Sequence, residues 1–105
     1  MLYDTRKEAA AACTREAAAA KHYSKLALEF ARNRKCRKAW DMADTATTAA
    51  KCAMQAHEAL WELSGGELTE KEWAAFEAAE VAQVDARQAV QAAKAAVDQV
   101  SQNIR

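Results

Sequence analysis

The chain has 105 residues, with 15 Lys or Arg and 15 Asp or Glu, so its formal net charge at pH 7 is zero. This length suits one compact domain, and the zero net charge argues against a generally basic protein that coats nucleic acid. Alanine supplies 29 residues, proline is absent and the only two glycines are adjacent, so strand-rich folds are excluded and an all-α fold is predicted.

The first predicted helix covers residues 5–32. Thr5 followed three residues later by Glu8 forms a candidate capping box, and apolar residues behind it recur at steps of three and four. The end of this helix is marked only by Asn33, which tolerates the left-handed conformation, and by the like charges of "RNRKCRK" at residues 32–38. We predict a turn there. Without it, one helix of about 60 residues would need a partner chain to cover it.

The second and third helices are separated by the clearest break in the chain. The second covers residues 36–64 and ends at Gly65 and Gly66, which readily adopt the left-handed conformation. The third covers residues 70–104, and two signals mark its start. Thr69 and Glu72 form a second capping box, while Leu68 and Trp73 have the spacing of a hydrophobic staple.

Three helices of similar length predict one domain over residues 1–105, an antiparallel three-helix bundle of up-down-up order. In that order, the alanines that begin the first helix lie beside Leu60, Trp61, Trp73 and Phe76. Small residues would then face large ones, and we expect the tryptophans to serve as anchors of the core or of an interface.

Charge is distributed unevenly along the chain. Residues 1–38 hold ten Lys or Arg and four Asp or Glu, a net charge of +6, whereas residues 39–105 hold five and eleven, a net charge of −6. In the bundle the two turns lie about 40 Å apart, well beyond a Debye length of about 8 Å. We define the basic pole as Arg32, Arg34, Lys35, Arg37 and Lys38, and the acidic pole as Glu58, Glu62, Glu67 and Glu70.

The basic pole has three interpretations. Its cations can complement the dipole at the end of the first helix and otherwise face solvent. They can form a contact site for an acidic partner, such as phosphate, nucleic acid or the acidic pole of a second copy. The third interpretation is a reactive Cys36, whose thiolate the neighbouring cations would favour.

We expect no catalytic site, no cofactor and no metal site. No serine, histidine and aspartate pattern or phosphate-binding loop occurs, and a slim bundle offers little concavity. Cys13, Cys52 and His57 could come near one another, but Cys52 and His57 diverge by about 140° around their helix. His57 is more simply a core or interface residue, and His22 a surface one.

The sequence thus predicts a non-catalytic protein-protein interaction module, an adaptor or an inhibitor of a larger protein, that binds through a charged pole or a helical face. The partner can be another protein or a second copy of the chain. The alternative is a nucleic-acid-associated protein that uses the basic pole. Three cysteines without CxxC spacing indicate free thiols, and no apolar run reaches about 18 residues, so we expect a cytoplasmic protein with no membrane partner.

Overall fold

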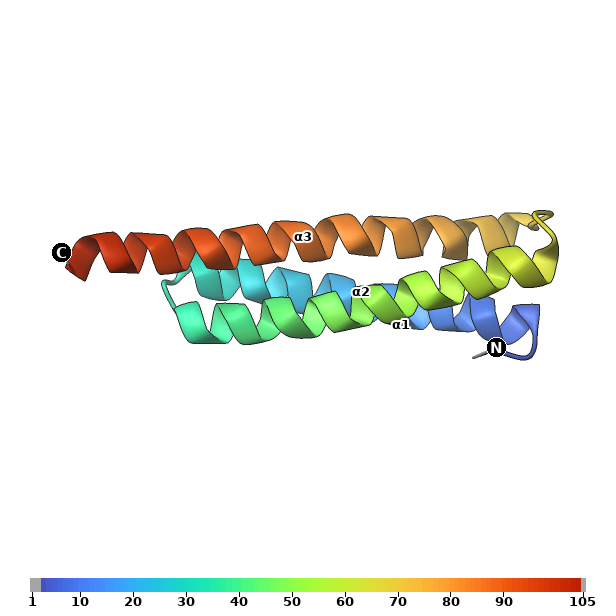
Figure 1. The fold of residues 1–105 in the computed structure, drawn as a ribbon, viewed down its shortest axis with the longest axis horizontal. Coiled ribbons are helices and arrows are strands. Elements are labelled where there is room, and N and C mark those ends of the chain that lie inside the picture. Colours follow the sequence, from blue (N-terminus) through green and yellow to red (C-terminus); the bar gives the residue numbers. More distant parts are fainter. Residues whose placement is uncertain (1–2, 105) are drawn as a thin grey trace.

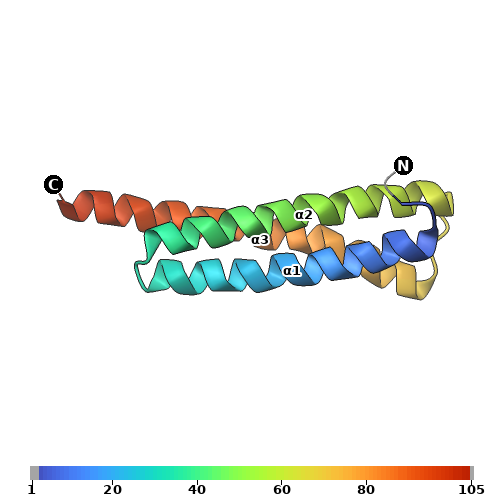
Figure 2. The same cartoon turned by 90° about the horizontal axis from the view of Figure 1, so that it is seen from below.

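The computed structural model describes residues 3–104, with side chains described through residue 99. Its three helices are α1 (Arg6–Arg32), α2 (Cys36–Ser64) and α3 (Glu70–Ile104). They run antiparallel in up-down-up order and pack against one another in a rod of 56 × 23 × 16 Å (Figures 1 and 2). The predicted all-α three-helix bundle is confirmed. The two turns lie at opposite ends, and the end of α3 extends past the α1–α2 turn (Figure 1).

Side-chain caps begin α1 and α3. The Thr69 hydroxyl accepts a hydrogen bond from the Glu72 backbone N–H at 3.2 Å, and the Glu72 carboxylate accepts one from the Thr69 N–H at 3.0 Å, which completes the capping box. At α1 the Thr5 hydroxyl likewise accepts from the Glu8 N–H at 3.1 Å. The Glu8 carboxylate, however, accepts from the Asp4 N–H at 3.3 Å, so only half of the predicted box forms here.

In the turn between α1 and α2, the residue in the left-handed conformation is one position later than expected. Asn33 has φ −90°, and its N–H still bonds to the Glu29 carbonyl, so it closes the helix instead of reversing the chain. Arg34 takes the left-handed conformation, with φ 60°. The Arg34 and Lys35 N–H groups then donate to the last carbonyls of α1, at 3.1 and 2.8 Å, in a Schellman motif.

The core is built almost entirely from alanine. Among the described residues, the buried apolar side chains are all alanine except Cys13 and Leu60. Alanine methyl groups let the three helices approach closely, and each adds only about 0.8 kcal/mol of hydrophobic stabilisation. Larger side chains, including Tyr23, Phe30 and Trp40, pack around the edges of this alanine core.

Of the two expected roles of the tryptophans, core anchor or interface anchor, the core role does not hold for Trp61 and Trp73. Trp61 is 45% exposed and Trp73 is 41% exposed. The physical reason is the close approach of the alanine faces, which leaves no space for an indole ring between the helices. Trp61 instead lies over the α2–α3 turn, where its ring atom Cζ2 is 3.4 Å from the position that a Cβ at Gly66 would occupy.

Candidate interaction surfaces

The basic pole forms the end of the rod at the α1–α2 turn. Its five side chains, Arg32, Arg34, Lys35, Arg37 and Lys38, are all exposed. Among the side chains of residues 3–99, no carboxylate forms an ion pair with any of them. The Lys38 Nζ lies 5.7 Å from the ring centroid of Phe30, which provides a cation–π contact. The sequence-predicted cations are therefore brought together at one end.

Helix dipoles account for only part of this cluster. Arg32 is in the last turn of α1, where a cation is favourable. Arg37 and Lys38 are in the first turn of α2, which contains no acidic residue, and Lys35 provides no side-chain cap there. A cation at this end of a helix is unfavourable by about 0.3–1 kcal/mol. Dipole complementation therefore explains Arg32 but not the other two.

The acidic pole lies at the other end, around the α2–α3 turn, and Glu58, Glu62, Glu67 and Glu70 are all exposed. One cation from α1 joins it. Arg6 forms two bonds with Glu72, from Nη2 at 2.6 Å and from Nε at 3.0 Å, and Nη2 also donates to the Glu67 carbonyl at 2.8 Å. These Arg6 hydrogen bonds, with that from the Thr69 N–H, lower the pKa of Glu72 to about 2.

Two cations lie on one face of this end. Lys7 and Lys71 line a hollow of about 320 Å³ between α1 and α3, next to Glu72. This face therefore carries both signs of charge. The face between α2 and α3 differs, because no Lys or Arg lines the groove at its turn end.

That groove, here called the aromatic groove, has a volume of about 430 Å³ and is lined by His57, Glu58, Trp61, Trp73 and Phe76. The Trp73 ring lies at a large angle to the Phe76 and Trp61 rings. The Trp73 ring is 5.4 Å from the Phe76 ring and at 82° to it, and 6.5 Å from the Trp61 ring and at 68° to it. The Trp61 and Phe76 centroids are 5.6 Å apart. Three aromatic side chains thus form a rigid, partly exposed surface with a carboxylate on its wall.

His57 forms the inner side of the aromatic groove. Its ring stacks on Phe76 with centroids 3.5 Å apart. Its Nε2 is buried without a hydrogen bond among the described residues, and the nearest carboxylate oxygen, on Glu80, is 3.9 Å away. Burial lowers the pKa of His57, although Glu80 opposes the shift. The imidazole is therefore neutral at pH 7 and adds no positive charge to the groove.

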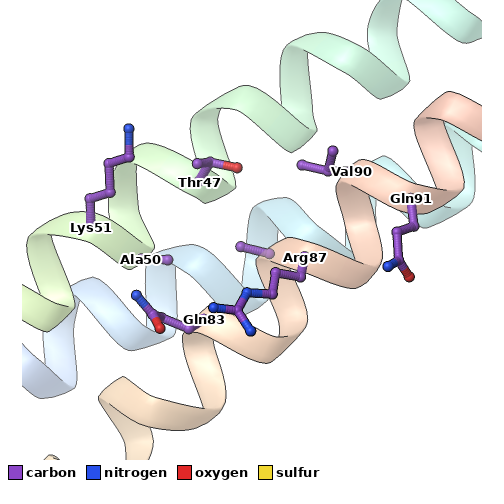
Figure 3. Close-up of a pocket in the computed structure, with 8 residues that line it drawn as sticks. Thr47, Ala50, Lys51, Gln83, Arg87, Val90 and Gln91 are labelled. Atoms are coloured by element: carbon purple, nitrogen blue, oxygen red, sulfur yellow. The ribbon is translucent and has the colours of Figure 1, made fainter.

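A second hollow of about 350 Å³ lies farther along α2 and α3 (Figure 3). Ala50 and Ala86 are among the residues that line it. Figure 3 shows Lys51 extending away from Arg87, so the two cations of this hollow do not converge on one point. The arrangement does not form a binding site for an anion.

The three cysteines are free thiols. Cys13 is buried in the core with its sulfur 4.0 Å from the Ala53 carbonyl oxygen, and burial raises its pKa to about 11. It is therefore protonated and unreactive at pH 7. Cys36 is half-buried, with its sulfur 3.8 Å from the Arg34 carbonyl oxygen, and its proposed reactivity stays a prediction. His22 is exposed, as expected.

In the part of the chain that the structure describes, no three His, Cys, Asp or Glu side chains converge as they would around a metal ion. Within the same part, none of the three helices combines the length and the apolar composition that crossing a bilayer requires.

The aromatic groove was not predicted because Trp61 and Trp73 were allowed a place in the core, facing the alanines of the first helix. The alanines of α3 repeat on one face, at Ala75, Ala79 and Ala82, and Trp73 lies on the opposite side of the helix. Trp61 follows Leu60, which is the true core position, by about 100° around α2. The alanine repeat alone would have placed both indoles outside the core.

Comparisons of the chain with protein-family models, with curated proteins and with solved structures each find no match. Any functional conclusion therefore rests on the residues of this chain.

Proposed function

We propose that the protein is a non-catalytic interaction module that binds a larger, basic protein at its acidic end, as an adaptor or as an inhibitor that covers part of that protein's surface. The observation that supports this most is the aromatic groove. Two exposed tryptophans line it beside the Glu58 carboxylate, and no Lys or Arg is among its lining residues. Exposed tryptophans on a rigid element are typical of the residues that dominate protein interfaces.

The rest of the acidic end favours a basic partner. The four carboxylates of the acidic pole are exposed, and among the described side chains none of them is in an ion pair. The negative electrostatic potential of these carboxylates speeds the encounter with a positively charged protein and fixes the orientation in which that protein docks.

A cytoplasmic location is part of the proposal. The free thiols of Cys13, Cys36 and Cys52 support it, because reducing compartments keep thiols unpaired.

Affinity capture with three baits tests this function. Wild type is compared with Glu58→Gln/Glu62→Gln, at the acidic pole, and with Arg34→Gln/Lys35→Gln, a matched double neutralisation at the basic pole. Each bait is used in extract of the source cells, and retained proteins are quantified by mass spectrometry. We expect a basic protein that wild type and the basic-pole variant retain and the acidic-pole variant loses. The same proteins on all three baits, or a loss confined to the basic-pole variant, would contradict the proposal.

The second candidate function is nucleic-acid association through the basic pole. It is favoured by the two cations at the start of α2, Arg37 and Lys38, which the helix dipole does not explain. The basic pole lacks a free ring for base stacking, because Phe30 is half-buried and covered by Lys38. Binding would therefore be electrostatic and strongly dependent on salt.

Titration with DNA and RNA at low salt tests this second candidate. Affinity that falls with added salt and disappears in Arg34→Ala/Lys35→Ala/Arg37→Ala would support it. No binding at low salt would exclude it.

A further inference from the structure

We infer that the aromatic groove binds an arginine side chain of the partner, with the guanidinium held by Trp61 and Trp73, stacked on the face of one of the two rings, and paired with Glu58. This inference rests on the proposed function and specifies the chemistry of its partner. It assigns the groove to an arginine-containing segment of another protein.

The aromatic surface is available in the folded chain. Trp61 and Trp73 are close to half-exposed, at 45% and 41%, although both rings contact Phe76. Their mutual contacts fix the rings before a ligand arrives, so little side-chain entropy is lost on binding. A planar cation fits an open slot of this kind, because it stacks on a ring face while its edge remains free for a carboxylate.

The charge around the aromatic groove points to a cation. Glu58 lines the groove, and the Glu80 carboxylate is 3.9 Å from His57 at its inner side. The only cation–π contact among the described residues is at the opposite end, where Lys38 lies over Phe30. The chain therefore covers the ring at its basic pole with its own cation and leaves the rings at its acidic pole without one.

Arginine fits these features better than lysine does. Guanidinium is planar, more weakly hydrated than an ammonium group, and able to donate two parallel hydrogen bonds to one carboxylate. A stacked position over Trp with a carboxylate at its edge uses all three properties. Lysine can use only the charge.

A second copy of the chain is a poorer occupant. If its arginines at the α1–α2 turn docked end to side, the contact would be heterologous, would not close and would give an open chain of molecules. The end of α3 also projects beyond that turn (Figure 1), so the turn is not the tip of the rod at that end. We therefore assign the groove to a different protein.

Three labelled peptides with the full-length protein test the inference. Each peptide has three variable positions separated by Gly-Ser spacers. These positions hold arginine in the first peptide, lysine in the second and citrulline in the third. Citrulline is neutral and nearly isosteric with arginine. Dissociation constants are measured by fluorescence anisotropy at about 20 mM salt, where surface charges are little screened. We expect the arginine peptide to bind at least about fivefold more tightly than the lysine peptide, and the citrulline peptide not to bind.

Matched variants locate the site. Trp73→Leu is expected to raise the dissociation constant of the arginine peptide by about 5-fold to 30-fold, close to that of the lysine peptide. Trp40→Leu, at the other end of the rod, leaves this constant unchanged. Glu58→Gln weakens the binding of the arginine peptide. Glu29 is also an exposed glutamate but lies far from the groove, so Glu29→Gln does not weaken that binding. Circular dichroism confirms that each variant is folded, and Glu58→Gln, on the surface, keeps the test valid if Trp73→Leu is unstable.

Different failures have different meanings. Equal binding of the arginine and lysine peptides, unchanged by Trp73→Leu, would overturn the inference and leave the proposed function in place. No binding of either peptide to wild type would contradict both. Self-association in sedimentation velocity that Trp73→Leu abolishes would assign the groove to a second copy and would also overturn the inference.

Discussion

At the scale of single residues, Arg34 determines where the chain first reverses. It is the one described residue other than glycine with positive φ, at 60°. An L-residue with a side chain is strained there by about 1 kcal/mol, and glycine is not. We expect Arg34→Gly to raise the free energy of unfolding by about 0.5–1 kcal/mol.

The neighbouring position is the control. Lys35 has φ −93°, where glycine relieves no strain, so Lys35→Gly should destabilise the protein. Urea unfolding of both variants measures the difference. A loss of stability in Arg34→Gly similar to that in Lys35→Gly would contradict this description of the turn.

Glu72 links the start of α1 to the start of α3. Because its folded-state pKa is lowered from 4.5 to about 2, mainly by hydrogen bonding to Arg6, it contributes stability that is complete above pH 4.5 and is lost as the pH falls through about 2. We expect wild type to melt at a higher temperature than Glu72→Gln at pH 7, with a difference that narrows between pH 4.5 and pH 2.

Thermal melts of both proteins across that range provide the measurement. Glu58→Gln is the control, because the Glu58 carboxylate forms no ion pair among the described side chains and its loss should matter little at any of these pH values. A difference between wild type and Glu72→Gln that stays constant down to pH 2 would show that the Arg6 pair is not formed.

At the scale of the helices, the sequence signals that begin α1 and α3 could be recognised, but the width of the buried helix faces could not. Thr69 and Glu72 are a local signal, since the hydrogen bonds of a capping box need only residues three apart. The position of Trp61 follows from the repeat of buried residues along the whole of α2, which a local signal between residues three apart does not show. The groove was hidden for that reason, although its glutamate, Glu58, was named from the sequence.

The alanine core gives a prediction at this scale. Ala46 is fully buried in α2, and Ala18 is exposed in α1. Leucine at position 46 would separate helices that alanine holds close together, so Ala46→Leu should lower the free energy of unfolding by about 1–3 kcal/mol. Ala18→Leu, with the same change in volume, should alter it by less than about 0.5 kcal/mol. Urea denaturation of the pair measures both, and an equal effect of the two would refute close packing at Ala46.

At the scale of the whole molecule, the rod has ends of unlike charge, but the acidic end is two-sided. Counting charge over residues 1–38 and 39–105 predicted the two poles. It did not show that Arg6 and Lys7 lie at the acidic end, because α1 spans the rod and starts at that end. Arg6 pairs with Glu72 on one side. On the other side the Glu58 carboxylate lines a groove with exposed tryptophans, and that combination is the basis of the functional proposal.

The most direct test of this account uses the three tryptophans as reporters. Trp61 and Trp73 line the aromatic groove, and Trp40 packs near the basic pole. In a ¹H–¹⁵N spectrum each indole N–H gives its own signal, and the arginine peptide is added stepwise. The account predicts that the Trp61 and Trp73 signals shift together and saturate while the Trp40 signal stays in place. Shifts of equal size at Trp40, or no shift at Trp61 and Trp73, would contradict it.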